Sequence, residues 1–205
     1  GSLGWRKGTD LFVQIARRIA MDEGRDNMRF LWVGGNRGDR EASEFRHDGD
    51  LLGLGTHCRL IHASGDVSDH YCAMDVFALT SREDPYPLVM LEAGAHGLPV
   101  VAFDGSGGAV EFTRAGTGAC VPYLDVDAFA RELMRLRDSP MAVQALGATA
   151  RRQVAEAHDI EVQGPKLLAL MDECLVSRGI SVRGDAAGRK LLGHRSDTRI
   201  ALDRT

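Results

Sequence analysis

The feature that most constrains this chain is an apolar segment that runs directly into a polar loop and then into a helix. Residues 76–79 have the pattern of a buried strand, residues 81–87 are polar with two prolines, and residues 88–96 have the pattern of a helix. Ligands of open α/β sheets bind where the carboxyl end of a parallel strand meets the amino end of a helix. The first amides of a helix are unpaired and attract anions such as phosphate. The sequence therefore predicts a ligand site at this junction.

Strand and helix patterns alternate along the rest of the chain. Further strands are expected over residues 28–33, 58–62, 99–103 and 119–122. Helices are expected from Thr9 onwards and over residues 67–73, 109–113, 125–136, 142–157 and 162–175, whereas residues 36–50 are expected to be a loop with a short helix. Thr9 and Asp125 should cap the helices that they begin, and Gly97 should end the helix before it. Strands separated by helices indicate a Rossmann-like α/β fold with a doubly wound parallel sheet.

Composition and charge argue against several classes of function. The chain is 44% hydrophobic, which is enough for a full core, and its net charge of -4 gives no basic field to attract nucleic acid. No apolar run is long enough to span a membrane. The cysteines are widely spaced without a CxxC pair, which favours reduced core thiols in a cytosolic protein. They are Cys58, Cys72, Cys120 and Cys174.

Two carboxylates lie at the predicted ligand site, Asp84 in the loop and Glu92 on the helix. An ionised carboxylate only accepts hydrogen bonds, which suits sugar hydroxyls. Glu92 shares a helix face with Leu88 and Ala95, and we expect this face to pack towards the sheet. A carboxylate at the edge of a buried surface needs partners, either a ligand or a nearby arginine. Anion-seeking amides beside hydroxyl-seeking carboxylates suggest a sugar nucleotide.

Cations precede the first predicted helix. Lys7 opposes the helix dipole unless an anion is shared between them, so it is either a phosphate contact or a solvated charge, and Arg6 has the same two interpretations. Gly107 and Gly108, followed by Glu111, form either a second anion nest or a tight turn. The histidines show no metal-ligand spacing, so no metal site is predicted.

Four segments in this order resemble a known family. They are RKGTDLF at 6–12, DVFALTSREDP at 75–85, LEA at 91–93 with GLPVVA at 97–102, and GGAVE at 107–111. Together they resemble the C-terminal, donor-binding domain of GT-B glycosyltransferases, specifically glycosyltransferase family 4. The likeness covers about residues 1–175.

The resemblance implies roles for individual residues. Lys7 would hold the donor diphosphate, Asp84 would contact the transferred sugar, and Glu92 would bind the ribose hydroxyls. Lys7 and Asp84 are thus the candidate catalytic residues. Glu83 lies beside Asp84, so either could reach the sugar. The arginine that the family usually has a few residues before Lys7 is not evident, because Gly1 or Ser2 stands there, so either the diphosphate clamp is weakened or Arg6 substitutes.

Backbone amides after Asp84 would also touch the donor. Prolines at 85 and 87 stand where the family often has glycine, and proline has no amide hydrogen. The remaining candidate donors are Tyr86, Leu88 and Val89.

The resemblance also implies what the chain does. It would be the nucleotide-sugar half of a retaining glycosyltransferase that needs no metal or other cofactor and takes part in surface polysaccharide or glycolipid biosynthesis. The N-terminal acceptor domain would lie upstream and is absent from these residues. The enzyme would be cytoplasmic, with peripheral contact to the inner membrane as an option. Two alternatives stay open: a non-catalytic sugar-nucleotide-binding module that regulates or scaffolds a partner, and a sugar-nucleotide epimerase of the same fold.

The chain divides into two parts by composition. Residues 1–180 are expected to form the donor-binding domain. Residues 181–205 are rich in Lys and Arg and lack an apolar period, which favours a weakly ordered basic tail that is dispensable for folding. A short basic helix over 189–194 that touches a membrane surface is the alternative for this tail.

Overall fold

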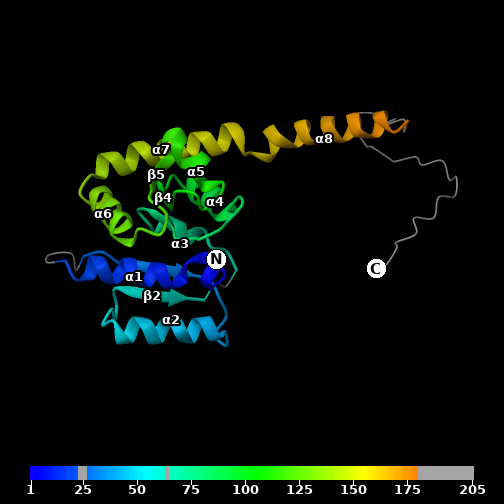
Figure 1. Ribbon diagram of the computed structural model, residues 1–205. Coiled ribbons are helices and arrows are strands. Elements are labelled where there is room, and N and C mark those ends of the chain that lie inside the picture. Colours follow the sequence, from blue (N-terminus) through cyan, green and yellow to red (C-terminus); the bar gives the residue numbers. More distant parts are fainter. Residues whose placement is uncertain (23–26, 63–64, 180–205) are drawn as a thin grey trace. The chain divides into compact units, whose positions relative to one another are not determined.

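The computed structural model describes residues 1–22, 27–62 and 65–179 (Figure 1). The chain divides into two compact units, Gly1–Asp159 and Ile160–Thr205. The elements of the first unit are η1 (Trp5–Lys7), α1 (Thr9–Ala20), β1 (Phe30–Val33), α2 (Arg40–Leu51), β2 (Cys58–Ile61), α3 (Ser68–Cys72), β3 (Phe77–Leu79), α4 (Leu88–Ala95), β4 (Val100–Phe103), α5 (Ala109–Phe112), η2 (Thr113–Thr117), β5 (Gly118–Val121), α6 (Val126–Arg137) and α7 (Pro140–Ala157).

The second unit contributes the helix α8 (Ile160–Ser177) to the described residues. The domain predicted over residues 1–180 spans the first unit and this helix. The predicted tail, residues 181–205, lies outside the described residues, as does its suggested helix at 189–194. Among the helices that the structure describes, none has the length and apolar character needed to cross a membrane.

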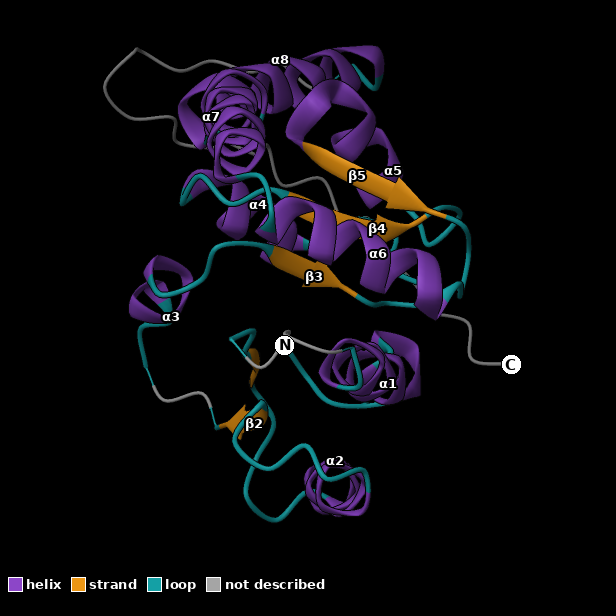
Figure 2. Cartoon of the chain, turned by 90° about the vertical axis from the view of Figure 1, so that its left-hand side faces the viewer, coloured by secondary structure: helices purple, strands orange, loops and turns teal. Residues whose placement is uncertain are grey.

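All strand pairs are parallel, and they form two groups (Figure 2). In one group β1 pairs with β2, with Phe30 opposite Cys58. In the other, β4 lies between β3 and β5, with Val100 opposite both Phe77 and Gly118. Helices connect successive strands, so the predicted α/β, doubly wound parallel architecture is confirmed.

The strand β4 shows why helices are needed on both faces of the sheet. All four of its residues are fully buried. Val101 and Phe103 belong to a core with α1 and α6, whereas Val100 and Ala102 belong to a second core with α4 and α5. Successive strand residues point to opposite faces, so an unbroken apolar strand requires a helical layer on each side.

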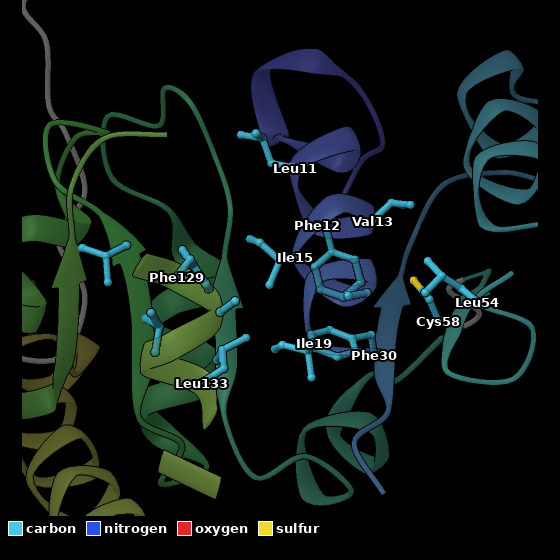
Figure 3. Close-up of a cluster of buried hydrophobic side chains, with 14 of the residues drawn as sticks. Leu11, Phe12, Val13, Ile15, Ile19, Phe30, Leu54, Cys58, Phe129 and Leu133 are labelled. Atoms are coloured by element: carbon cyan, nitrogen blue, oxygen red, sulfur yellow. The ribbon is translucent and has the colours of Figure 1, made fainter. Parts of the chain in front are cut away.

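The helix α1 joins the two groups of strands (Figure 3). Its residue Phe12 packs edge-on against Phe30 of β1, with 5.7 Å between the ring centroids. The same buried cluster contains Ile15 of α1, Phe129 of α6 and Val101 of β4. The predicted apolar face of the first helix is therefore confirmed, and it covers both groups.

Helix ends agree with the sequence at two of three positions. The Asp125 carboxylate accepts from the Ala128 amide at 2.8 Å and caps α6, as predicted. Gly97 follows α4 with φ of 77°, a left-handed conformation that glycine adopts without strain. The predicted Thr9 cap is wrong, because Gly8 holds the cap position of α1 and the Thr9 hydroxyl bonds back to Gly4.

Two other predictions need correction. Residues 36–50 are more helical than expected, because Ala42 and Phe45, three positions apart, give α2 a buried side. The cysteines are not all core thiols: Cys58 is buried, but Cys72 and Cys174 are exposed. Burial raises the pKa of the Cys58 thiol to about 12, which keeps it protonated.

Candidate active site

Lys7 is carried by a rigid turn between η1 and α1. The next residue, Gly8, has φ of 69°, and a β-carbon there would lie 1.9 Å from the Thr80 carbonyl oxygen. The buried Thr80 hydroxyl donates to the carbonyl oxygens of Lys7 and Gly8 at 3.2 and 3.1 Å. Glycine is therefore required beside Lys7, and the end of β3 fixes where the lysine begins.

Lys7 and Asp84 meet across the site. The Lys7 ammonium donates to Asp84 Oδ2 in an ion pair whose carboxylate side chain is 9% exposed and whose lysine side chain is 28% exposed. Asp84 follows β3 and Lys7 precedes α1, so 77 residues of sequence separate the partners. The two candidate catalytic residues are thus brought together at the carboxyl end of β3.

A second ion pair holds the segment that carries Lys7. The Arg82 guanidinium donates to both carboxylate oxygens of Asp10 at 2.7 Å and to the Trp5 carbonyl oxygen at 2.7 Å. It also lies over the Trp5 ring, 4.9 Å from the ring centroid. Arg82 lowers the pKa of Asp10, so the carboxylate stays charged at neutral pH. This clamp ties η1 to the loop that follows β3.

The loop from Gly105 to Gly108 docks on the Asp84 loop. The Asp84 amide donates to Ser106 O at 2.7 Å, and the Gly108 amide donates to Pro85 O at 2.9 Å. A β-carbon on Gly107 would lie 1.9 Å from Asp84 O. These glycines allow two loops to touch, and the Gly108 amide is already used, which favours the tight-turn interpretation over an anion nest.

Glu92 does not lie on the face that was expected. The buried residues of α4 are Met90, Ala93 and Gly94, while Leu88 and Glu92 are exposed. Apart from Glu92, every residue of α4 is apolar or glycine, so hydropathy could not select the buried side. Close packing selects it instead, because a β-carbon on Gly94 would lie 2.9 Å from atoms of the side chains that cover it, Phe112 and Val154.

The partner of Glu92 is a tyrosine. The Tyr71 hydroxyl, on α3, donates to Glu92 Oε2 at 2.7 Å. Burial and the bond to Glu92 raise the pKa of Tyr71, so its hydroxyl keeps the proton that it donates. The alternative of an arginine partner is therefore replaced by a neutral donor, which fixes one carboxylate oxygen.

The amino end of α4 faces the same region. Pro87 precedes the helix, no side chain caps it, and its first turn carries no acidic residue. Met90 donates to Pro87 O, so the free amides at this end belong to Leu88 and Val89. Val89, Glu92 and Lys7 all line one cavity of about 1150 Å³.

The other candidates lie further out. The side chains of Arg6 and Glu83 are exposed and make no hydrogen bond or ion pair among the residues described. The Tyr86 ring packs on His158, with 5.9 Å between ring centroids, and burial and Glu111 raise the pKa of its hydroxyl. Within the described ranges, no group of three or more His, Cys, Asp or Glu residues is arranged to hold a metal ion.

Sequence reasoning missed three residues that support the site. Tyr71 gave no signal, because it lies 21 positions before Glu92 in the sequence, which hides the contact. Arg82 and Thr80 lie inside the segment that carried the family resemblance, between β3 and Asp84. A search for hydrogen-bonding residues around the candidate carboxylate could have found these two.

Comparisons with known proteins show the family of the chain. Residues 1–139 match the model of the family described as glycosyl transferases group 1. The chain is 30% identical over 177 residues to a GDP-mannose-dependent monoacylated alpha-(1-6)-phosphatidylinositol monomannoside mannosyltransferase of Corynebacterium glutamicum, covering 81% of this chain and 44% of that protein. It is 32% identical over 165 residues to a D-inositol 3-phosphate glycosyltransferase of Kineococcus radiotolerans, covering 72% of this chain and 37% of the relative. The chain thus spans less than half the length of these relatives.

Solved structures share the fold. The C-terminal domain of a glycosyl transferase group 1 family protein (LpcC) from Francisella tularensis superposes with a TM-score of 0.68 at 19% identity, covering 78% of this chain and 84% of that one. Anabaena Alr3699/HepE in complex with UDP gives a TM-score of 0.75 at 19% identity, covering 84% of this chain and 47% of the other. The chain therefore belongs to the glycosyl transferases group 1 family and has the fold of the C-terminal half of a GT-B enzyme.

Proposed function

We propose that Gly1–Asp159 binds a nucleoside-diphosphate sugar and supplies the donor half of a retaining glycosyltransferase. The observation that carries this proposal is the contact between Lys7 and Asp84 beside the free amino end of α4. A cation, two open amides and a carboxylate then converge at the carboxyl end of a parallel strand, where ligands of this fold class bind.

Lys7 would hold the diphosphate. An ammonium has three donors, so Lys7 can keep its bond to Asp84 and still donate to phosphate oxygens. The amides of Leu88 and Val89 lie at the positive end of the α4 dipole, which favours the same anion. These fixed donors would stabilise the charge that builds on the leaving diphosphate during transfer.

The carboxylates would orient the sugars. Tyr71 holds Glu92 Oε2 at 2.7 Å, and the other oxygen remains able to accept from ribose hydroxyls. Asp84, fixed by Lys7 and by its own amide bond to Ser106, would accept from the transferred sugar. Tyr71 is thus a positioning residue for Glu92 in this scheme.

The acceptor would come from elsewhere in a longer protein. The relatives named above are roughly twice the length of this chain, and their names include phosphatidylinositol-linked and inositol phosphate acceptors. We infer an acceptor in surface polysaccharide or glycolipid biosynthesis. The chain by itself is expected to bind nucleoside diphosphates without robust sugar transfer.

The test is a ribose-specific binding experiment on Glu92. Charged hydrogen bonds contribute about 1.5–3 kcal/mol, so Glu92→Gln should lower the affinity for UDP or GDP, whichever binds, about tenfold to a hundredfold. A 2′,3′-dideoxy nucleotide should bind wild type about as weakly as the normal nucleotide binds the variant. Glu156→Gln, an exposed glutamate on α7, is the matched control and should bind like wild type. A Glu92→Gln variant that still discriminates between the two nucleotides as wild type does would remove Glu92 from the ribose site.

A further inference from the structure

The segment that carries Lys7 has little of its own to hold it in place. The helix η1 is only three residues long, Trp5–Lys7, and none of them is buried. Glycines flank it on both sides, Gly4 before it and Gly8 after it, and glycine leaves the backbone free to turn. A short exposed helix between two glycines must take its position from residues that bind it from outside.

Two residues that follow β3 bind this segment through its carbonyl oxygens. The buried Thr80 hydroxyl donates to the carbonyl oxygens of residues 7 and 8 at 3.2 and 3.1 Å. Arg82 donates to the two that precede them, through its guanidinium to residue 5 at 2.7 Å and through its amide to residue 6 at 2.9 Å. Four consecutive carbonyl oxygens around Lys7 are therefore held from residues 80–82.

The Arg82 side chain also contacts the chain on both sides of Lys7. Its guanidinium lies over the ring of Trp5, two residues before the lysine, 4.9 Å from the ring centroid. It donates to both carboxylate oxygens of Asp10, three residues after the lysine, at 2.7 Å each. A planar guanidinium matches a carboxylate in this two-bond geometry, which a lysine ammonium does not reproduce. One side chain thus fixes the chain just before and just after Lys7.

The same contacts leave Arg82 badly placed to bind phosphate itself. Its side chain is 10% exposed, and the Asp10 carboxylate balances its charge. Three of its five N–H donors are already bonded to Asp10 and to the Trp5 carbonyl oxygen. The Lys7 side chain is more accessible, at 28% exposed. An effect of Arg82 on a bound anion should therefore pass through Lys7.

We propose that Arg82 is a positioning residue for Lys7 and fixes η1 so that the lysine ammonium meets the donor diphosphate beside Asp84. This role rests on the proposed function, in which Lys7 holds the diphosphate. In an active site a misplacement of about 1 Å can cost about a hundredfold in rate. Because residues 80–84 carry both the clamp on η1 and Asp84, the lysine and the carboxylate are held by one segment of chain.

The test is a double-mutant cycle between Arg82 and Lys7, measured by calorimetry with UDP or GDP and with the matching nucleoside. Arg82→Ala should lower the affinity for the diphosphate about tenfold and change the affinity for the nucleoside little. In the Lys7→Ala background it should add less than about a twofold loss, since residues that act through one contact are not additive. Asp10→Asn should give a smaller loss of about threefold, and it keeps the test decisive if Arg82→Ala does not fold.

Two further variants separate the geometry of Arg82 from its charge. Arg82→Lys keeps the cation without the fork, so it should lose nearly as much diphosphate affinity as Arg82→Ala. Arg135→Ala is the matched control, because Arg135 makes the same two-bond contact to Glu132 on α6, and it should bind like wild type.

Amide exchange tests the positioning without a ligand. The Gly8 amide donates to the Trp5 carbonyl oxygen at 3.0 Å, so its exchange reports how firmly η1 is held. In Arg82→Ala and in Asp10→Asn it should exchange faster, by about tenfold in the first. The Asp104 amide, which donates to Val121 O at the end of β4, should exchange as in wild type in both variants.

Four outcomes would overturn the proposal. An undiminished loss from Arg82→Ala in the Lys7→Ala background would mean that Arg82 binds the phosphate itself. Equal losses of diphosphate and nucleoside affinity would indicate general support of the fold. Full diphosphate affinity in Arg82→Lys would show that charge alone suffices. Unchanged exchange of the Gly8 amide would show that η1 does not depend on the clamp.

The failure of this proposal differs from the failure of the proposed function. If Lys7→Ala lowers diphosphate affinity and Arg82→Ala binds like wild type, Lys7 keeps its role and only the positioning by Arg82 is wrong. If wild type binds no nucleoside diphosphate, the proposed function is wrong and the positioning role with it.

Discussion

The two groups of strands differ in how completely they are enclosed, and the candidate site lies where they meet. All four residues of β4 are fully buried between two helical layers, whereas in β1 only Phe30 is buried. Asp84 follows the enclosed group and is held by backbone bonds to the neighbouring loop. Lys7 belongs to the segment that crosses between the groups. The carboxylate is thus built on a rigid support, while its lysine partner depends on how the groups are joined.

Truncating a buried side chain should show the largest difference in stability loss between the two groups of strands. Phe103→Ala in β4 removes a fully buried ring that packs 5.0 Å from Phe129, and it should lower the free energy of unfolding by about 4 kcal/mol. Leu31→Ala in β1 removes a half-buried side chain and should cost about 1 kcal/mol. Urea unfolding of both variants measures the difference. Equal losses would show that the two groups are enclosed alike.

The contact between the two loops at Asp84 is the next test. Gly107→Ala places a methyl group 1.9 Å from Asp84 O at a φ of 125°, and it should destabilise by about 3 kcal/mol and weaken nucleotide binding. Gly105→Ala is the matched control, because its φ is 76° and nothing lies within 4 Å. It should cost about 1 kcal/mol and leave binding unchanged. If the two alanines have the same effect, the loops do not need to touch.

The smallest expected effect concerns the clamp on η1. Arg82 lowers the pKa of Asp10, so the stabilisation is present above the ordinary aspartate pKa of 3.8 and is lost as pH falls through the lower folded value. The Asp10 side chain is 43% exposed, so Asp10→Asn should cost no more than about 1 kcal/mol at pH 7. The free energies of unfolding of wild type and variant should converge as the pH is lowered below 3.8. A difference in unfolding free energy between wild type and variant that stays constant down to about pH 2 would contradict the ion-pair explanation.

The sequence predicted elements that depend on local chemistry and missed contacts between distant residues. The α6 cap depends on Asp125 and an amide three residues later, so it was predictable. The rotation of α4 was not, because its residues are nearly all apolar and the choice of face depends on how closely Gly94 can approach α7.

Within the site, motif order predicted that Asp84 would lie beside a helix start. The ion pair with Lys7 and the bond from Tyr71 to Glu92 bridge separate elements. Spacing along the chain carries no signal for either contact. Only the packing of α3 and η1 around the end of β3 brings these side chains together.

The most direct test of the account is calorimetry of Lys7→Ala with a nucleoside diphosphate and with the matching nucleoside, beside Arg6→Ala. If Lys7 holds the diphosphate, Lys7→Ala should lower the affinity for UDP or GDP about tenfold to a hundredfold and change the affinity for the nucleoside little. Arg6→Ala should change both only slightly, since its side chain is exposed and has no partner among the described residues. Equal losses of diphosphate and nucleoside affinity in Lys7→Ala would contradict the account, because Lys7 would then support the fold of the site without binding phosphate.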